Sequence, residues 1–278
     1  MNNQPQALID RDNNQLVDEF TREKKIPVVE IFGPTIQGEG PLAGSKTMFV
    51  RTGGCDYRCQ KCDSLHAVDP RAVKKNARRM TSQEILDELI PVMEKTNTQW
   101  VTLSGGNPCM WDFSHVQQGI QKAGFYTAVE TQGTLCPDWL RQANMVVCSP
   151  KSYGMGEKFE EGKFTDFMTK LRGRTMVALK VVIFSAVDIE MALGMGQMAL
   201  EIGTVPRGMR FFSLGNSYPP KLKEDLTLSE NVQSNSLIPT LMQSYRQLIE
   251  EIVTDPRIED WKFLPQLHVL AYGNEEGR

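Results

Sequence analysis

Three cysteines lie within an eight-residue stretch, and their number and spacing indicate a metal cluster. Cys55, Cys59 and Cys62 follow the pattern Cys-x3-Cys-x2-Cys, with no fourth cysteine or histidine at a comparable interval. Three thiolates can bind three irons of a cubane 4Fe–4S cluster and leave the fourth iron open to a small molecule. A structural zinc site or an electron-transfer cluster would normally have a fourth protein ligand. A zinc or redox site, completed by the nearby His66, is the alternative interpretation.

Paired glycines follow two expected strands and would let a ligand approach the backbone closely. Gly53-Gly54 lie between a strand and the first cysteine, and Gly105-Gly106 follow a second strand. Without a Cβ, these residues let the chain wrap around cluster sulfurs and lie against a bound molecule. An open iron beside such a strand end suggests a ligand that chelates through amino and carboxylate groups, of which S-adenosylmethionine is the common example. A tight turn is the alternative explanation for the second pair.

Composition excludes several other classes of protein. The 278 residues are 40% hydrophobic and 23% charged, and the formal net charge of −3 argues against a sequence-independent nucleic-acid binder. No apolar run reaches the roughly 18 residues of a membrane span, and residues 1–23 lack the apolar region of a secretory signal. We therefore expect a cytoplasmic protein with no direct nucleic-acid or membrane partner. In that setting Cys109, Cys136 and Cys148 are expected to be packed thiols, not disulfides.

Strand and helix patterns alternate along the chain and predict a parallel sheet with right-handed crossovers. Residues 1–25 predict a disordered N-terminal arm, which leaves residues 26–278 as a single domain. The expected strands cover residues 28–32, 46–51, 100–103, 125–130, 145–148, 177–184 and 209–212. The expected helices are one opened by a capping box at 81–84, and others at 113–122, 138–142, 186–201 and 237–253. Gly33-Pro34 should stop the first strand, and residues 152–163 and 216–236 should be loops or insertions.

The motifs fall at one end of this expected sheet. Six strand-and-helix units fit a partial (β/α)6 barrel of the TIM type better than a closed eight-fold barrel. Functional residues on such a fold gather at the carboxyl ends of the strands. The motifs at those ends are Cys55, Ser104-Gly105-Gly106, Thr131-Gln132-Gly133 and Ser149-Pro150-Lys151.

Seven stretches of the chain, in order, resemble the radical S-adenosylmethionine enzymes, and within them the 7-carboxy-7-deazaguanine synthase family. The matching stretches are residues 30–40, 47–55, 104–108, 130–134, 149–151, 179–184 and 264–268. The element Gln37-Gly38-Glu39-Gly40 is far more specific than the cysteines, which the whole superfamily shares. The resemblance is strongest to the branch found in Bacillus-like bacteria, and it implies the partial barrel typical of radical S-adenosylmethionine enzymes.

The resemblance also implies a reaction. The family converts 6-carboxy-5,6,7,8-tetrahydropterin to 7-carboxy-7-deazaguanine with loss of ammonia, on the route to queuosine and other deazapurines. In that family the reduced cluster cleaves S-adenosylmethionine, and the 5′-deoxyadenosyl radical takes a hydrogen from C6 of the pterin. The ring then contracts, S-adenosylmethionine is regenerated, and Mg²⁺ assists. A homodimer and a flavodoxin- or ferredoxin-type reductant are further implied partners.

The resemblance assigns a role to each matched residue. The cluster ligands would be the three cysteines, and Ser64 would supply a hard oxygen ligand to Mg²⁺. Positions matched to S-adenosylmethionine contacts are Lys61, Cys62, Asp63, Gly106, Ser149, Pro150 and Lys151. Positions matched to substrate contacts are Ile36, Gln37, Gly38, Glu39, Arg51, Ser104 and His268, the last with Gln266 beside it. Gln37 and Glu39 can pair with the amide and amino edges of a pterin, and Arg51 can hold its carboxylate.

Each assignment has a structural alternative. Arg51 could pair with a surface acid, and Glu39 could be solvated in its glycine-rich loop. Ser64 could cap a helix, Lys151 could be an exposed loop lysine, and His268 could be a satisfied core histidine.

Two positions depart from the superfamily pattern. Asn107 stands where many members have Glu after the glycines, and its carbonyl could still accept from a ligand amino group. Lys61 stands where an aromatic residue often precedes the third cysteine, and it cannot stack on adenine in the same way. Two other functions compete with the ring-contracting enzyme: a glycyl-radical activating enzyme, and a non-catalytic iron–sulfur or zinc module.

Overall fold

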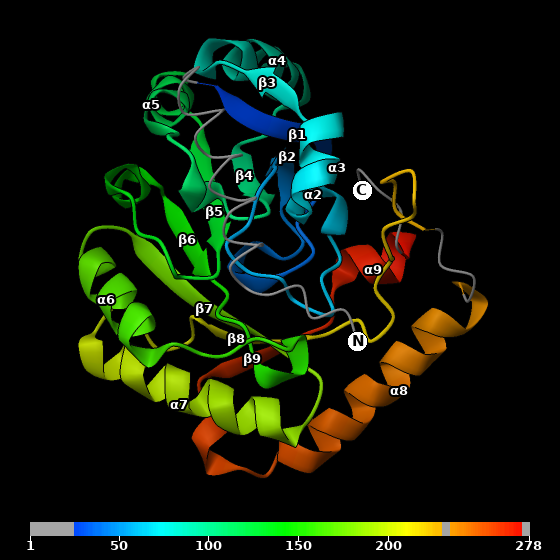
Figure 1. Ribbon diagram of the computed structural model, residues 1–278. Helices are drawn as coiled ribbons and strands as arrows, with labels where there is room; N and C mark the ends of the chain where they lie inside the picture. The colour runs from blue at the N-terminus through cyan, green and yellow to red at the C-terminus, as the bar shows by residue number, and fades with distance from the viewer. Residues whose placement is uncertain (1–24, 230–233, 274–278) are drawn as a thin grey trace.

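A single nine-stranded sheet forms the centre of the residues that the structure describes, 25–229 and 234–273. In this computed structural model the strand order is β3-β1-β2-β4-β5-β6-β7-β8-β9 (Figure 1). Six parallel pairings join the strands from β2 to β9, and β1 and β3 are antiparallel at one edge. The strands are β1 (Ile26–Ile36), β2 (Lys46–Thr52), β3 (Arg78–Met80), β4 (Trp100–Gly105), β5 (Tyr126–Thr131), β6 (Met145–Cys148), β7 (Met176–Ile183), β8 (Arg210–Leu214) and β9 (Trp261–Leu264).

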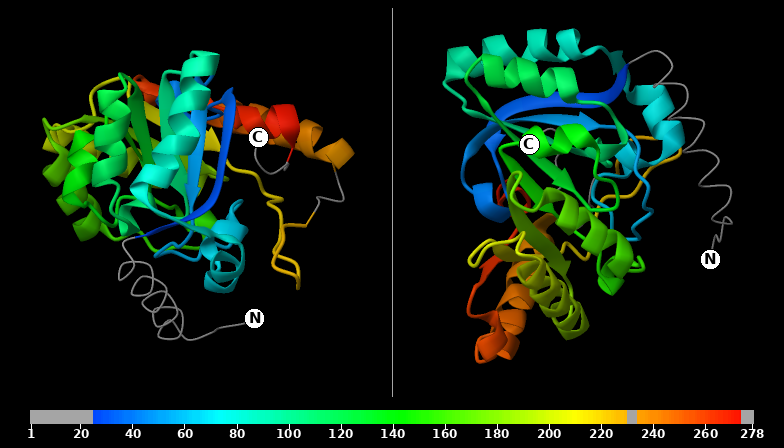
Figure 2. Two further views of the ribbon diagram at one scale, coloured as in Figure 1. Left: turned by 90° about the horizontal axis from the view of Figure 1, so that it is seen from above. Right: turned by 90° about the vertical axis from the view of Figure 1, so that its left-hand side faces the viewer.

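Helices cover the outer side of this curved sheet, whose concave side faces the centre of the molecule (Figures 1 and 2). The α-helices are α2 (Leu65–Val68), α3 (Pro70–Asn76), α4 (Ser82–Thr96), α5 (Ser114–Lys122), α6 (Glu161–Leu171), α7 (Ala186–Ile202), α8 (Ser234–Ile252) and α9 (Leu267–Tyr272). Short 3-10 helices are η1 (Gly40–Leu42), η2 (Pro108–Met110), η3 (Asp138–Gln142), η4 (Tyr153–Met155) and η5 (Pro256–Ile258). The sheet is open, because β3 and β9 each pair with a single neighbour within the described residues.

The partial α/β barrel expected from the sequence is therefore confirmed, although its parallel part has one strand more than expected. The extra strand is β9. It follows the predicted helix α8 in the sequence and pairs with β8. The capping box at Thr81 and Glu84 is present at the start of α4, and the expected strand at 46–51 is β2. The expected N-terminal arm lies outside the described residues except for Lys25.

One strand boundary was wrong. β1 continues through Gly33-Pro34 to Ile36 instead of stopping there. The register with β2 shifts between Phe32 and Thr35, and β3 pairs with β1 only at residues 26–28. Proline is tolerated at such a bulge on an open strand edge, because its missing N–H removes no ladder hydrogen bond.

Two stretches that were expected to be irregular include a short helix or the start of a longer one. Residues 152–163 include η4, and α6 begins at Glu161. Within 216–236 the described part has one isolated bridge, Leu222 to Leu228, and α8 begins at Ser234. α2, α3, β3 and α9 were not expected, since each is too short to show a periodic apolar pattern.

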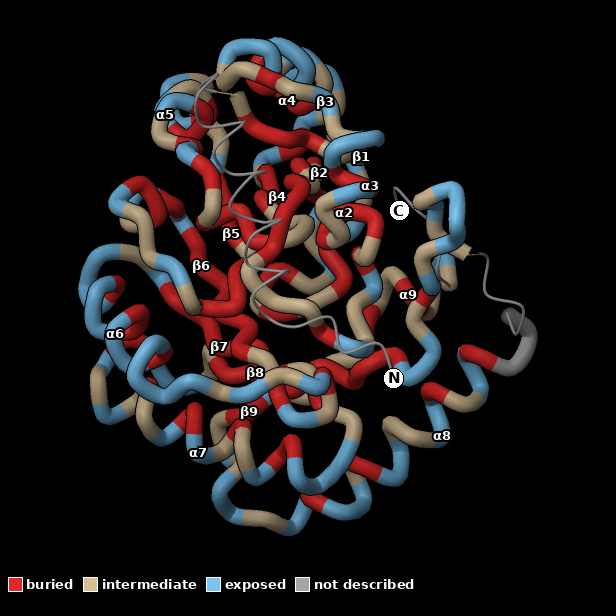
Figure 3. Tube along the Cα trace, in the orientation of Figure 1, coloured by how far each residue is buried: buried red, intermediate tan, exposed pale blue. Residues whose placement is uncertain are grey.

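Two hydrophobic clusters leave space at one end of the barrel. The larger cluster lies between the sheet and its outer helices, and the strands β6, β7 and β8 are buried along most of their length (Figure 3). The smaller one comprises Leu42, Ala128, Met145, Val147, Ala178 and Phe211. Leu42 comes from η1, which contacts β7 and β8. Residues before the carboxyl ends of the strands thus fill part of the barrel interior, and polar side chains occupy the carboxyl ends.

Leu89 provides a test of the packing between α4 and the sheet. Its side chain is fully buried, so Leu89→Ala should lower the free energy of unfolding by about 2–5 kcal/mol. Leu135→Ala, at a position 38% exposed, should change it by no more than about 0.5 kcal/mol. Chemical denaturation of both variants measures the difference, and equal effects would contradict the assigned packing.

Candidate active site

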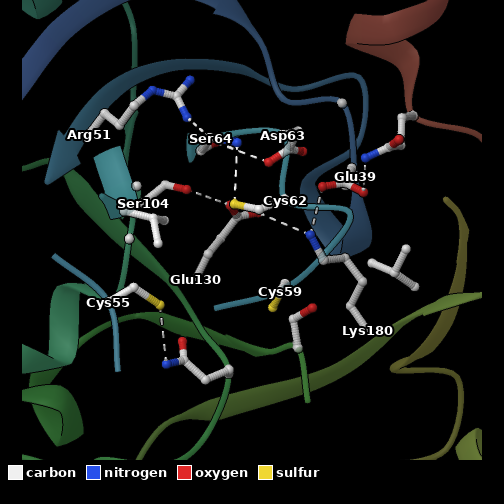
Figure 4. Close-up of a pocket in the computed structure, with 18 of the residues that line it drawn as sticks. Glu39, Arg51, Cys55, Cys59, Cys62, Asp63, Ser64, Ser104, Glu130 and Lys180 are labelled. Atoms are coloured by element: carbon white, nitrogen blue, oxygen red, sulfur yellow. Dashed lines mark hydrogen bonds and ion pairs between the residues drawn. The ribbon is translucent and has the colours of Figure 1, made fainter. Parts of the chain in front are cut away.

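One pocket at the carboxyl ends of the strands brings together nearly all the residues that the sequence assigned to a site. Its lining includes every predicted cluster, S-adenosylmethionine, Mg²⁺ and substrate residue except Pro150. Pro150 is buried behind the lining residues Ser149 and Lys151. Figure 4 shows the three cysteines with the charged side chains Arg51, Asp63, Glu39, Glu130 and Lys180 around them.

The cysteine loop has the features of a cluster-binding loop. Cys55 and Cys59 are buried, and the backbone N–H groups of Tyr57 and Ser64 lie 3.4 Å from the sulfurs of Cys55 and Cys62. Burial raises the pKa of Cys55 to about 12 and that of Cys59 to about 11. Such thiols become thiolates when a bound metal supplies positive charge. The donor set and the N–H groups directed at sulfur therefore fit an iron–sulfur cluster.

The geometry does not fit the zinc alternative. Among the described residues, no three His, Cys, Asp or Glu side chains converge on a single metal ion. A zinc site requires such convergence, whereas in a cubane cluster each thiolate binds a different iron. None of the six cysteines is in a disulfide, and Cys109 and Cys148 are buried thiols, as expected.

The paired glycines hold the ends of β2 and β4 against each other. The N–H of Gly106 donates to the carbonyl of Thr52 at 2.9 Å, and the N–H of Asn107 donates to Gly54 at 2.7 Å. A Cβ on Gly106 would lie 1.9 Å from the Gly54 oxygen, and Gly105 has a φ of +116°. Both positions therefore require glycine. A tight turn alone does not explain Gly105-Gly106, because these residues also bring the end of β4 into close contact with the end of β2.

Asn107 does not line the pocket. Its side-chain oxygen accepts from the Cys109 N–H at 3.2 Å and from the Thr131 hydroxyl at 2.9 Å. Its amide donates to Asp56 at 2.8 Å, and Asp56 also accepts from Gln132 and Thr134. Instead of facing a ligand, Asn107 ties the cysteine loop to the end of β5.

An aromatic ring from another strand lies beside Lys61. The Lys61 ammonium is 3.8 Å from the centroid of the Phe184 ring, in cation–π contact. Phe184 follows β7 and lines the pocket. Lys151 and Ser149 line it too, and the Lys151 ammonium lies 3.4 Å from the Ser149 hydroxyl. The aromatic character missing at position 61 is thus present nearby, from a residue that was not singled out.

Arg51 and Ser64 form a polar link on the cysteine side of the pocket. The Arg51 Nη1 donates to the Ser64 hydroxyl at 3.0 Å, and Nε donates to Glu30 at 2.5 Å. The Ser64 hydroxyl donates to Asp63 at 3.0 Å. Ser64 stands at the N-cap position of α2, but its side chain makes no capping bond, so the helix-cap alternative is not supported.

A largely buried ion cluster lies on another side of the pocket, and only one of its members, Glu39, was predicted from the sequence as a site residue. Lys180 of β7 lies 2.7 Å from Glu39 and 3.6 Å from Glu130 of β5 (Figure 4). Burial alone would raise the pKa of Glu39, but the Lys180 ammonium, together with His268 and the Ser213 hydroxyl, outweighs that effect and lowers the pKa to about 2. The solvated alternative for Glu39 is therefore wrong. A lysine within the most apolar strand was the signal that could have identified Lys180.

Neutral side chains complete this cluster, one from the segment of Glu39 itself and three from other segments. Glu130 accepts from Gln37 at 3.3 Å and from Ser104 at 2.9 Å. Glu39 accepts from Ser213 at 2.6 Å and from Gln266 at 3.1 Å. The residues after β9 close the pocket, because a Cβ on Gly38 would lie 2.3 Å from the ring nitrogen of His268. His268 lines the pocket, as its substrate assignment requires.

Comparison with known proteins identifies the family. A family model described as a 4Fe-4S single cluster domain matches residues 36–132. The 7-carboxy-7-deazaguanine synthase of Bacillus cereus is 39% identical over 254 residues, which cover 91% of this chain and 99% of that protein. The Bacillus subtilis protein of the same name is 37% identical over 260 residues, with the same coverage. The chain belongs to the 7-carboxy-7-deazaguanine synthase family.

Solved structures support the fold. The crystal structure of QueE from Escherichia coli aligns with a TM-score of 0.55 at 19% identity, covering 90% of this chain and 97% of that one. The crystal structure of Streptococcus suis SuiB bound to precursor peptide SuiA aligns with a TM-score of 0.50 at 10% identity, covering 77% of this chain and 47% of that one.

Within the described residues, no helix is long and apolar enough to cross a membrane.

The contact between the ends of β2 and β4 can be tested at Gly106. Gly106→Ala should weaken S-adenosylmethionine binding at least about tenfold, because the added methyl displaces the Gly54 backbone before the cysteines. The control is Gly194→Ala, where a Cβ meets nothing within 4 Å and affinity should not change. Equilibrium dialysis of the reconstituted proteins measures both, and unchanged affinity in Gly106→Ala would contradict this account.

Proposed function

We propose that this protein converts 6-carboxy-5,6,7,8-tetrahydropterin to 7-carboxy-7-deazaguanine with loss of ammonia. The observation that carries the proposal is a single pocket lined both by the three cysteines and by the partly buried carboxylates Glu39 and Glu130. Such a pocket can hold a radical-generating cofactor beside a ring that presents N–H donors. Family membership over 91% of the chain supports the same reaction.

The cysteine side of the pocket suits the cofactors. Cys55, Cys59 and Cys62 would each bind one iron of a 4Fe–4S cluster. When bound, that cluster supplies the electron that cleaves S-adenosylmethionine. No other cysteine lines the described pocket, so one iron would stay open to that molecule. The residues proposed to contact S-adenosylmethionine are Lys61, Cys62, Asp63, Gly106, Ser149 and Lys151, with Pro150 supporting the last two from behind.

The charged side suits the pterin. An ionised carboxylate has about four lone-pair sites, and Glu39 uses three of them on Lys180, Ser213 and Gln266. One acceptor site remains for a ring N–H. Arg51 has five N–H donors and uses two on Glu30 and Ser64, which leaves donors for the substrate carboxylate. The other proposed substrate contacts are Ile36, Gln37, Gly38, Ser104 and His268.

Mg²⁺ would bind beside the substrate carboxylate. The Ser64 hydroxyl is a hard oxygen ligand, and Mg²⁺ usually keeps several waters and takes few protein ligands. Because Ser64 contacts Arg51 at 3.0 Å, a metal there would lie next to the group that holds the substrate. The geometry thus supports the metal role proposed for Ser64 over a role in capping α2.

The wider setting of the enzyme is also a proposal, supported by the family to which the chain belongs. The product would enter queuosine and other deazapurine biosynthesis, and so modification of transfer RNA. The enzyme would be a cytoplasmic homodimer reduced by a flavodoxin- or ferredoxin-type protein. Residues 26–278 would form one domain, in agreement with the single sheet of the described residues.

Product formation by the reconstituted protein tests the proposal. Protein loaded anaerobically with iron and sulfide, then reduced, should form 7-carboxy-7-deazaguanine from the carboxytetrahydropterin and S-adenosylmethionine, as detected by mass spectrometry. Cys59→Ala should lose the brown cluster absorbance and the product, because two thiolates cannot hold the cluster. Cys136→Ala, outside the pocket lining, should retain both. An intact cluster without product in the unsubstituted protein would contradict the proposal.

The metal site has its own test at Ser64. Ser64→Ala should lower the turnover rate about tenfold and remove its dependence on Mg²⁺ concentration, since the hydroxyl ligand is lost. Ser114→Ala is the control, because that hydroxyl bonds only to Asp112 on the surface. Rates measured across a Mg²⁺ titration decide the matter, and an unaltered Mg²⁺ dependence in Ser64→Ala would exclude the assignment.

A further inference from the structure

Lys180 is a buried cation placed between two carboxylates that face the pocket. It is 4% exposed and stands in the middle of β7, between Leu179 and Val181. Its ammonium reaches Glu39 at 2.7 Å and Glu130 at 3.6 Å, from strands and loops far apart in the sequence. In Figure 4 the Lys180 side chain extends to both acids from below.

Stability alone does not account for one buried and two partly buried charges in one cluster. Taking ions out of water costs about as much as their attraction returns, and an apolar residue of similar size is often as stabilising. The cluster also has one carboxylate more than it has ammonium groups, so this part of the pocket lining has an excess of acceptors. Such an arrangement is useful where a ligand brings N–H donors to it.

The other side chains that donate hydrogen bonds to the two acids are neutral. Ser213 and Gln266 donate to Glu39, and Gln37 and Ser104 donate to Glu130. Among the described residues, Lys180 is the ion-pair partner that these two acids share. Neutral donors can orient a carboxylate, but a nearby positive charge does more to keep a buried one ionised.

We propose that Lys180 is a positioning residue for substrate recognition: it keeps the Glu39 carboxylate charged and holds Glu39 and Glu130 in place so that both accept hydrogen bonds from the N–H edge of the pterin ring. This inference rests on the proposed function, because it takes the pterin as the ligand. The inference gives Lys180 of β7 a role in substrate specificity, which the family resemblance had not assigned to this residue.

The electrostatics of the site set the direction of the expected pH effect. With Lys180 present, the pKa of Glu39 is about 2, so Glu39 is ionised throughout the neutral range. Without Lys180, burial raises that pKa, and the carboxyl binds a proton as the pH falls. The remaining groups that face Glu39 are Ser213, Gln266 and His268, and the nearby Glu130 would favour the proton further.

The test compares Lys180→Met with the unsubstituted holoenzyme. Between pH 6 and 9, kcat/KM for the pterin should be lowered at least about tenfold at the acid end and should recover as the pH rises. The change should lie mainly in KM. Lys180→Arg, which keeps the charge, should restore a profile without this acid limb. Lys170→Met removes an exposed ion pair with Asp166 and serves as the matched control, with no change expected.

A double variant separates positioning from a general structural effect. Glu39→Gln cannot ionise, so Lys180→Met combined with Glu39→Gln should have a raised KM without the acid limb seen in Lys180→Met alone. A uniform loss at every pH in Lys180→Met, not rescued by Lys180→Arg, would overturn the proposal. An acid limb that persists in the double variant would overturn the assigned role of Glu39.

Direct binding keeps this test distinct from that of the reaction. Equilibrium dialysis of the carboxytetrahydropterin against the unreduced holoenzyme with S-adenosylmethionine needs no turnover. Binding with the expected pH dependence, but without product on reduction, would refute the proposed reaction and leave the role of Lys180 standing. Product formation with a pH-independent affinity in Lys180→Met would refute the role of Lys180 alone.

Discussion

The backbone contact between the ends of β2 and β4 determines where the rest of the site lies. Two hydrogen bonds, from Gly106 to Thr52 and from Asn107 to Gly54, join these strand ends where no Cβ can fit. The cysteine loop begins at the next residue, Cys55, and its direction is set by this junction. Asp56 then accepts hydrogen bonds from Asn107, which follows β4, and from Gln132, which follows β5. These two bonds fix the cysteine loop to the segments after both strands.

From this junction the pocket divides into two halves with different chemistry. The half beside the cysteines has sulfur ligands and small residues, as a cluster and its chelating ligand require. The other half has the Glu39–Lys180–Glu130 cluster, whose charges are paired because unpaired charges would not stay buried. Ser104 at the end of β4 bonds to Glu130 in the charged half, and Arg51 at the end of β2 bonds to Ser64 beside the cysteines. A substrate held by both halves would have its ring on the carboxylates and its carboxylate toward the metal.

Local signals in the sequence predicted the cofactor half well. The cysteine spacing, the paired glycines and the capping box at Thr81 each act within a few residues, and the structure has them in the expected places. Family resemblance then brought in Gln37, Glu39 and His268, which the structure places in the same pocket. The resemblance was confirmed by relatives that match nearly the whole chain.

Non-local pairing explains most of what the sequence did not reveal. Glu39 and Lys180 are 141 residues apart, so the sequence cannot show that one neutralises the other. Asn107 could have accepted a hydrogen bond from a ligand, but two of its three side-chain hydrogen bonds join Asp56 and Thr131, which only the fold brings near. β1 runs past Gly33-Pro34 because its partner strand tolerates a register shift there. Each of these outcomes depends on a neighbour supplied by the sheet.

A crystal structure of the anaerobically reconstituted protein with S-adenosylmethionine and the carboxytetrahydropterin tests the central claim most directly. The account predicts a cluster bound by Cys55, Cys59 and Cys62 with S-adenosylmethionine on the fourth iron. It also predicts the pterin ring against Glu39 and Glu130. A fourth protein ligand on the cluster, or a pterin bound away from these carboxylates, would contradict it.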